Sequence, residues 1–254
     1  MAKIIFISGA TAGFGKATAE KFASNGYHLI LNGRRTSRLN ELKKNIEEKY
    51  NSEVYLLPFD VQVKKDVFQA FESLPEKWKR IDVLVNNAGL ALGRDFVDEA
   101  DLDDWETMIN TNLKGLLYVT RAALPFMIPN KKGHIINLGS TAAKDVYEKG
   151  NVYCATKAAV DSISKGMRID LLKHHIKVTA IHPGAAETEF SVVRFKGDEA
   201  IAKTVYDGYT ALTAQDIADI IYYCATLPTH VCINDLVVTA TQQANAIYLL
   251  KDQQ

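Results

Sequence analysis

The sequence predicts a doubly wound α/β fold, a single Rossmann-type domain with seven parallel strands and helices on both faces of the sheet. Three observations favour it. Strand-like and helix-like segments alternate along all 254 residues. The first apolar run, Ile4–Ile7, is rich in β-branched residues, as in strands buried on both faces. A glycine-rich turn then leads into a helical segment, and this alternation is typical of a parallel sheet with helical crossovers.

The first half of the chain predicts four strands and the helices between them. The expected elements are a strand at 4–7, a helix to about residue 25, a strand at 28–32, a helix at 36–50, a strand at 53–57, a helix at 64–73 and a strand at 81–85. In the second helix, Leu39, Leu42 and Ile46 form one apolar stripe, which favours packing against a sheet.

The second half continues the same rhythm. It predicts one long helix or two consecutive helices at 102–127, a strand at 133–138, a helix at 151–174, a strand at 176–181, a helix at 214–226 and a strand at 235–239. We find no linker or repeat, so residues 1–254 are expected to form one domain. The stretch 187–209 has no clean period and follows the sixth strand, where such sheets bind ligands. We interpret it as a substrate lid; an ordinary pair of surface helices is the alternative.

Composition excludes several functional classes. The chain is 47% hydrophobic, has zero formal charge and has a pI near 7, which gives no general attraction to nucleic acid. No apolar run approaches the roughly 18–20 residues of a membrane helix.

The first strand begins near residue 3, which leaves no room for a signal peptide and predicts a cytoplasmic protein. Three cysteines cannot all pair, so we expect them to be reduced. No His, Cys or acid cluster has zinc-site spacing, so no metal is predicted.

The glycine-rich turn between the first strand and the first helix has the context of a phosphate-binding loop. Gly9, Gly13 and Gly15 are spaced G-x-x-x-G-x-G. Glycines allow a tight turn and a close approach to a pyrophosphate, and the following helix N-terminus offers free N–H groups. An ordinary glycine-rich βα turn is the alternative.

Two arginines follow the second strand, where an NAD-binding protein is expected to carry Asp or Glu for the ribose 2′-hydroxyl. Asn32 and Gly33 precede Arg34 and Arg35, and no acid is present at 32–34. Guanidinium groups pair with phosphate through forked, charge-assisted bonds. The sequence therefore predicts NADP as cofactor, with a solvated basic turn as the alternative.

Tyr153 and Lys157 are four residues apart in a predicted helix, which places both side chains on one face. An ordinary phenol has a pKa of about 10, and a nearby ammonium lowers it by favouring the phenolate. We therefore expect Lys157 to lower the pKa of Tyr153 and the pair to exchange a proton with an alcohol oxygen.

Seven motifs in order resemble the short-chain dehydrogenase/reductase family over nearly the whole chain. They are Ser8–Gly15, Asp60-Val61, Asn86-Asn87-Ala88-Gly89, Asn112, Ser140, Tyr153 with Lys157, and Pro183-Gly184 followed by Thr188. The resemblance implies NADP contacts from Gly9, Thr11, Gly13, Phe14, Gly15, Arg34, Arg35, Asp60, Val61, Asn87, Ala88, Tyr153, Lys157, Pro183, Gly184 and Thr188.

The same resemblance implies a catalytic set. Tyr153 would be the general base in oxidation and the general acid in reduction, and Lys157 would bind the nicotinamide ribose. Ser140 would hydrogen-bond the substrate oxygen. Asn112 would support Lys157 through a water. Outside the family context, Ser140 could be a strand-end turn residue and Asn112 a helix hydrogen-bonding residue.

A narrower resemblance is to a subgroup of NADP-dependent dehydrogenases that act on serine, allo-threonine and related 3-hydroxy acids. It rests on the segments GATAGFG, GRR, NNAGLALG, GNVY-ATK, ETEFS-VRFKGD and HVCIN-L, while Cys154 and His182 depart from common members. Because such substrates carry a carboxylate, a cation is expected near the lid. Arg194 is preferred over Lys196, since arginine binds carboxylates in bidentate fashion.

Alternative functions are a broad carbonyl reductase, a 3-oxoacyl reductase and, more remotely, a non-catalytic NADP-sensing protein. The partner in each enzymatic case is a small molecule. Family members commonly form tetramers, so the resemblance also implies a homotetramer built through the helices at 102–127 and 151–174. The apolar tail at 246–250 would add a further contact.

Overall fold

Seven parallel strands form the centre of the molecule in this computed structural model, which describes residues 2–252. The order across the sheet is β3-β2-β1-β4-β5-β6-β7. The strands are β1 (Ile4–Ile7), β2 (His28–Leu31), β3 (Val54–Leu56), β4 (Val83–Asn86), β5 (Gly133–Leu138), β6 (Ile176–Pro183) and β7 (Asp235–Val238). The predicted doubly wound, seven-stranded parallel sheet is therefore confirmed.

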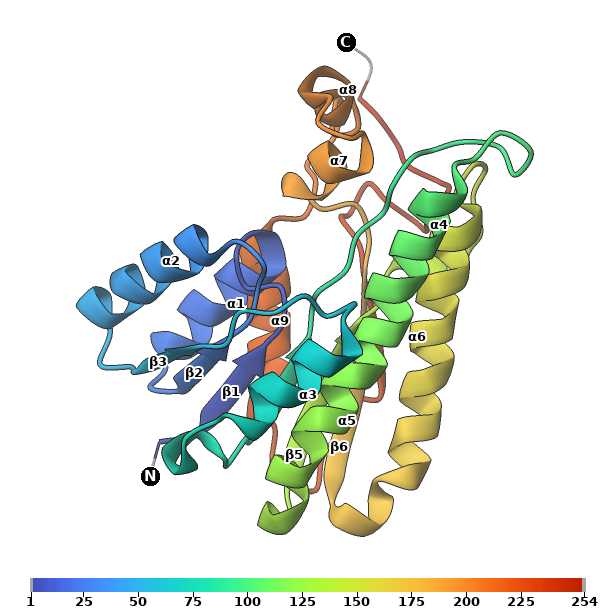
Figure 1. Ribbon diagram of the computed structural model, residues 1–254. Helices are drawn as coiled ribbons and strands as arrows, with labels where there is room; N and C mark the ends of the chain where they lie inside the picture. The colour runs from blue at the N-terminus through green and yellow to red at the C-terminus, as the bar shows by residue number, and fades with distance from the viewer. Residues whose placement is uncertain (1, 253–254) are drawn as a thin grey trace.

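Helices cover both faces of this sheet (Figure 1). One face carries α1 (Gly13–Ala23), α2 (Thr36–Lys49) and α9 (Ala214–Thr226). The other carries α3 (Lys64–Glu72), α4 (Leu102–Ile109), α5 (Leu116–Met127) and α6 (Asn151–Asp170). The short helices α7 (Glu189–Arg194) and α8 (Glu199–Thr204) stand apart, at the top of the view in Figure 1.

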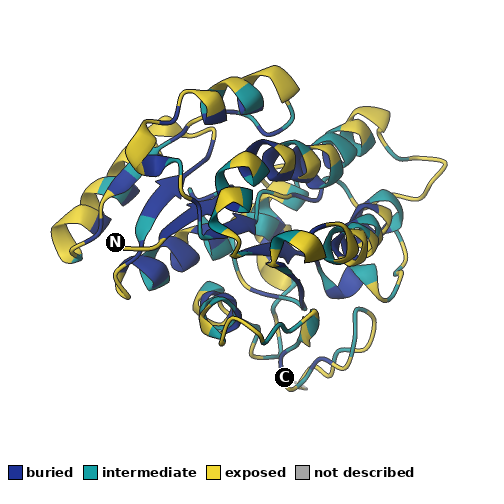
Figure 2. Cartoon of the chain, turned by 90° about the horizontal axis from the view of Figure 1, so that it is seen from below, coloured by how far each residue is buried: buried dark blue, intermediate teal, exposed yellow. Residues whose placement is uncertain are grey.

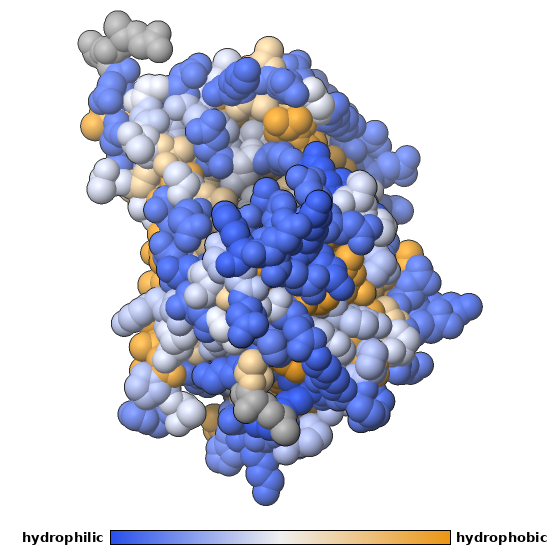
Figure 3. All heavy atoms as spheres, turned by 90° about the vertical axis from the view of Figure 1, so that its left-hand side faces the viewer, coloured by the Kyte–Doolittle hydropathy of each residue, from blue (hydrophilic) through white to orange (hydrophobic). Residues whose placement is uncertain are grey.

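The alternating side chains of the strands build two hydrophobic cores, one on each face. In β1, Ile5 and Ile7 contribute to the core beneath α1, α2 and α9, whereas Ile4 and Phe6 contribute to the core on the opposite face. This follows from the period of two in a strand. Buried strands lie between helices whose outer faces are exposed (Figure 2). The side of the molecule seen in Figure 3 presents mostly hydrophilic residues.

Several boundaries differ from the predictions. β4 starts at Val83 rather than at Ile81, and β6 extends to Pro183 because its last residues pair with β7. The predicted long helix is divided by a π-helical turn at Asn110–Gly115. α6 ends at Asp170 and is followed by a 3₁₀ turn and by His175 in the left-handed region.

Within residues 2–252, no helix combines the length and the apolar character needed to span a membrane. Cys154, Cys224 and Cys232 are free thiols in the structure, two of them buried.

Candidate functional site

A cavity of about 670 Å³ lies at the carboxyl ends of the strands, on both sides of the point where the strand order reverses between β1 and β4. In doubly wound sheets this crevice is where ligands bind. The predicted site residues that line it are Gly9, Thr11, Gly13, Phe14, Arg34, Arg35, Asp60, Val61, Asn87, Ala88, Ser140, Tyr153, Lys157, Pro183, Gly184, Thr188 and Arg194. Gly15 and Asn112 lie behind this lining.

The glycine loop approaches neighbouring backbone too closely for larger residues. Gly9 has φ +66°, and a Cβ there would lie 2.9 Å from Ala88 Cα. A Cβ on Gly15 would lie 2.3 Å from the Gly9 carbonyl oxygen. Gly15 therefore serves the packing of the loop. The N-cap of α1, Ala12, offers no side-chain hydrogen bond, so the first N–H groups of the helix are left for a ligand anion.

The two predicted arginines lie at one end of the cavity. Arg34 Nη1 is 3.5 Å from Asp60 Oδ2, and Arg35 donates to Thr11 Oγ1 at 2.9 Å. Glu189, the first residue of α7, accepts from Arg35 at 2.9 Å and from Arg38 at 2.6 Å. Three guanidinium groups thus lie beside two carboxylates, Arg35 and Arg38 at Glu189 and Arg34 at Asp60, which leaves a net positive charge suited to a phosphate.

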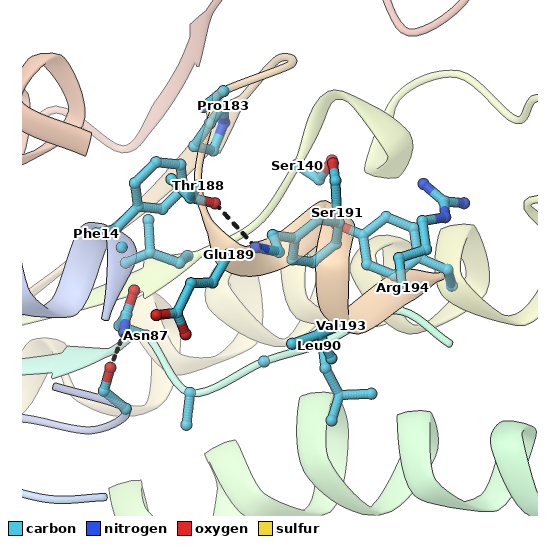
Figure 4. A pocket seen from close by; sticks show the side chains of 18 of the residues that line it. Phe14, Asn87, Leu90, Ser140, Pro183, Thr188, Glu189, Ser191, Val193 and Arg194 are labelled. Atoms are coloured by element: carbon cyan, nitrogen blue, oxygen red, sulfur yellow. Dashed lines mark hydrogen bonds between the residues drawn. The ribbon is translucent and has the colours of Figure 1, made fainter. Parts of the chain in front are cut away.

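Arg38 was not predicted from the sequence. It lies one turn into α2, and its spacing from Arg35 on a helical face was the available signal. Figure 4 shows Glu189 and Arg194 on side chains that leave α7 in different directions, so this short helix connects the arginine end of the cavity to its other end.

Tyr153 and Lys157 lie one turn apart on α6 and are both buried. Lys157 Nζ donates to the Leu138 carbonyl oxygen at 2.9 Å and lies 5.9 Å from the centre of the Tyr153 ring. Ser140 Oγ accepts from the Ala142 N–H at 3.1 Å, which leaves its own proton free to donate. Three of the four predicted catalytic side chains, Ser140, Tyr153 and Lys157, therefore lie together at one end of the cavity.

The expected effect of Lys157 on the tyrosine is wrong in this structure. Burial raises the pKa of Tyr153, and Tyr147 adds to the increase, while the Ser140 hydrogen bond and the Arg194 charge act against it. Burial also lowers the pKa of Lys157 to about 8. Loss of hydration disfavours the charged form of both groups, and it is the largest cause of each shift. Tyr153 is therefore held as a protonated phenol, the form that donates a proton.

This shift of Lys157 predicts a pH-dependent stability in the cofactor-free protein. The folded chain loses the Lys157 proton near pH 8, whereas an unfolded lysine holds it to about pH 10.4. Between these values the unfolded state binds more protons, so stability rises with pH. The free energy of unfolding of the wild type, minus that of Lys157→Met, should increase by about 1 kcal/mol per pH unit on average from pH 8 to 10. Urea titrations would measure it; a constant difference would contradict a shifted Lys157.

Asn112 lies within the π-helical turn, a feature that is frequent at functional sites. Its amide donates to the Leu90 carbonyl oxygen at 2.8 Å and to Thr156 Oγ1 at 3.1 Å, and its oxygen accepts from the Leu90 N–H at 2.8 Å. A Cβ added at Gly89 would lie 3.2 Å from Asn112 Oδ1 and 3.4 Å from Lys157 Nζ. Asn112 and Lys157 thus flank the same glycine, and the expected water-mediated link stays a prediction.

Arg194 and Lys196 differ sharply in their surroundings. Arg194 lines the cavity, donates from Nη2 to the Tyr147 hydroxyl at 2.8 Å and holds its Cζ 5.5 Å from the centre of the Tyr153 ring. Its Nε is buried and has no hydrogen-bond partner. Lys196 is half-exposed and pairs with Asp104 at 2.8 Å. Only Arg194 of these two is placed to meet a substrate anion beside Tyr153.

Tyr147 was missed by the sequence interpretation. It lies in the loop before α6, lines the cavity and stacks near Arg194, whose Cζ is 5.4 Å from the centre of its ring. Burial raises the pKa of Tyr147, so its hydroxyl stays protonated beside the guanidinium. An aromatic residue six positions before Tyr153 was the available signal.

Asp161, His182 and Asp235 come together near the base of the site, although their sequence spacing gives no metal motif. The Lys144 ammonium lies 2.8 Å from Asp235 and 3.2 Å from Asp161, and Lys165 lies 2.9 Å from Asp161. Two ammonium groups therefore balance the two carboxylates. The positive charge in this cluster comes from Lys144 and Lys165.

Comparison with known proteins gives consistent matches along the chain. Residues 3–199 match the family model of the short chain dehydrogenases. The chain is 48% identical over 244 residues to the NADP-dependent 3-hydroxy acid dehydrogenase YdfG of Salmonella typhi, covering 96% of this chain and 97% of that protein. It is 45% identical over 245 residues to sulfoacetaldehyde reductase 2 of Chromohalobacter salexigens, covering 96% of each.

A solved structure is also similar over nearly the full length. The closed form of serine dehydrogenase complexed with NADP⁺ matches with a TM-score of 0.92 and 45% identity, covering 98% of this chain and 100% of that one. The similarity covers α7, which borders the cavity, and α8, since so little of either chain is left unmatched.

Proposed function

Because this chain belongs to the short-chain dehydrogenase family, we propose that it is an NADP-dependent oxidoreductase of short 3-hydroxy acids. The substrate class comprises serine, allo-threonine, 3-hydroxyisobutyrate and 3-hydroxypropionate or malonic semialdehyde. One observation carries this proposal: the Arg194 guanidinium lines the cavity beside Tyr153. A carboxylate bound there would place a nearby carbinol within reach of the phenol.

The residues of the cavity fit NADP. The uncapped N-terminus of α1 suits a pyrophosphate, and Arg34 and Arg35 suit a 2′-phosphate. Asn87, Thr188 and Pro183 line the path between the glycine loop and Tyr153. When bound, NADP supplies the hydride acceptor or donor of the reaction.

The protein's part in the reaction is positioning and proton transfer. Ser140 and Tyr153 bind the substrate oxygen, and Tyr153 donates its phenolic proton to that oxygen in reduction and accepts it in oxidation. Lys157 binds the nicotinamide ribose and holds it beside Tyr153. Asn112 supports Lys157 through a water. Arg194 holds the substrate carboxylate and fixes which carbon faces the cofactor.

The segment 187–209 is proposed as the lid of a single domain that comprises residues 1–254. α7 lies within it, and Thr188 packs against the glycine loop, where a Cβ on Gly13 would lie 3.4 Å from Thr188 Cβ. Gly197 and Gly208 both have positive φ, and they bracket α8. The lid therefore contains helices, yet one of them borders the cavity, which favours the substrate-covering interpretation.

The substrate class is tested by NADP-linked oxidation of serine, allo-threonine, 3-hydroxyisobutyrate and 3-hydroxypropionate, with NADPH-linked reduction of sulfoacetaldehyde and a 3-oxoacyl thioester in parallel. Turnover of the hydroxy acids above the thioester supports the proposal. Higher turnover of sulfoacetaldehyde would instead indicate that Arg194 binds the sulfonate group of the substrate. Preference for the thioester or for uncharged ketones would overturn the hydroxy acid assignment.

Cofactor choice gives a separate prediction. Replacing Arg34 and Arg35 with Ala should weaken NADP binding far more than NAD binding, because only NADP carries the 2′-phosphate. Fluorescence titration with NADPH and NADH measures both affinities. Replacing Lys43, an exposed residue on the same helix as Arg38, with Ala is a control that should leave both unchanged. Equal losses for the two cofactors would contradict the assignment.

A cytoplasmic homotetramer is the proposed assembly. Exposed apolar residues on the helical face and in the tail support it, namely Leu102, Leu117, Ile169, Leu172, Ile247, Tyr248 and Leu250. Burial of this surface between copies would remove it from water. Light scattering at micromolar concentration should give four times the 28.2 kDa chain mass. A monomeric mass would contradict the proposal.

A further inference from the structure

The carboxylate–histidine cluster behind Ser140 is not used by the mechanism above. His182 is fully buried near the end of β6, next to the nicotinamide-end Pro183. Its ring packs directly on the backbone before Ser140, since a Cβ on Gly139 would lie 2.3 Å from His182 Nδ1. The imidazole is therefore fixed against the segment that presents the catalytic serine.

Both nitrogens of the His182 ring lie close to polar groups. On one side, the Ser140 N–H points to His182 Nδ1 at 3.3 Å, and the Ser140 carbonyl oxygen is 3.2 Å from the same nitrogen. On the other side, Nε2 lies 3.6 Å from Asp161 Oδ1 and 3.7 Å from Asp235 Oδ2. His182 Nε2 and Asp161 Oδ1 are both buried, and neither has a hydrogen-bond partner within 3.5 Å among the described residues.

These contacts select one tautomer. Burial, reinforced by the Lys144 ammonium, lowers the pKa of His182, although the two carboxylates act in the opposite direction. Lys144 and Lys165 already balance Asp161 and Asp235. A neutral imidazole carries one proton. On Nδ1, that proton would leave the Nε2 lone pair against two carboxylates; on Nε2, it points to them, and Nδ1 can accept from Ser140.

We propose that His182 is a positioning residue for Ser140, held as the Nε2–H tautomer by Asp161 and Asp235 so that Nδ1 fixes the Ser140 backbone N–H. The inference rests on the proposed function, because it gives Ser140 the role of binding the substrate oxygen. Asp161 follows Tyr153 and Lys157 on the same face of α6, at successive intervals of four residues. One helix therefore carries the proton donor, its neighbouring cation and the carboxylate that orients the support of the serine.

The first test is spectroscopic and does not depend on the substrate. In protein labelled with ¹⁵N-histidine, the His182 resonances are identified by their loss in His182→Asn, and long-range ¹H–¹⁵N spectra assign the tautomer. Protonated Nε2 with unprotonated Nδ1 across pH 6–8 is expected. A proton on Nδ1, or an imidazolium in that range, would overturn the proposal even in an enzyme with a different substrate.

The second test is kinetic and uses the best substrate of the panel. His182→Leu should lower kcat by about tenfold to a hundredfold, in line with misplacement of a reacting group. His182→Asn should recover most of that loss, because its amide oxygen can accept from the Ser140 N–H. His134→Leu is the control, since His134 is another buried histidine, bonded to Thr179 and away from Ser140. Equal kcat losses in His182→Leu and His182→Asn, or no loss in either, would overturn the positioning role.

Discussion

Tyr153→Phe should lower turnover by about 10²-fold or more, since positioned acid–base groups contribute about 10²–10⁴ to the rate. The substitution keeps the ring, including its contact with Phe190 at 5.7 Å between centroids, and removes the hydroxyl that carries the transferable proton. Steady-state kinetics in both directions would measure the loss. Affinity for NADPH should change little, and this gives an internal check that the cavity is intact.

The raised pKa of Tyr153 also predicts how the rates of reduction and oxidation depend on pH. Because burial favours the phenol, the wild-type enzyme holds the proton that reduction requires throughout the neutral range. Oxidation requires the phenolate, so its rate should rise with pH while the rate of reduction stays level. Near-normal turnover in Tyr153→Phe would remove this residue from the mechanism, whatever the pH profile of the wild type.

Arg194→Met should lower kcat/KM for serine or 3-hydroxyisobutyrate by roughly tenfold to a few hundredfold, matching about 1.5–3 kcal/mol for a charged hydrogen bond. Methionine keeps much of the length of the side chain and removes the guanidinium. Its removal also leaves the Tyr147 hydroxyl without its donor, which is why uncharged ketones are needed as comparison substrates. Their kinetics should change much less, because they carry no carboxylate.

Lys196→Met is the matched control for Arg194→Met. Lys196 lies on the same lid segment but pairs with Asp104 at the surface, so its loss should leave hydroxy acid kinetics near the wild-type values. If both variants keep normal kinetics for the hydroxy acids, the carboxylate is bound elsewhere or the substrate has none. A loss in Lys196→Met alone would reverse the assignment of the two cations.

The sequence by itself determined the order of the strands and helices along the chain, and it located the glycine loop and part of the residues that line the cavity. Hydrophobic period and composition are local properties of the chain. Ile4–Ile7 is therefore recognised as a buried strand, and the spacing of Tyr153 and Lys157 predicts that both lie on one face of a helix. Ser140 and Thr188 were found only through the family motifs, since neither residue is distinctive alone. The family motifs thus predicted residues that local patterns did not.

Only the tertiary structure decided which charges meet and how deeply they are buried. It placed Arg194, rather than Lys196, against Tyr153, and it reversed the expected direction of the Tyr153 pKa because dehydration outweighed the nearby cation. It also joined His182 on β6 to Asp161 on α6. Such contacts join segments far apart in the chain, and both their distances and their hydration depend on the packed fold rather than on local sequence.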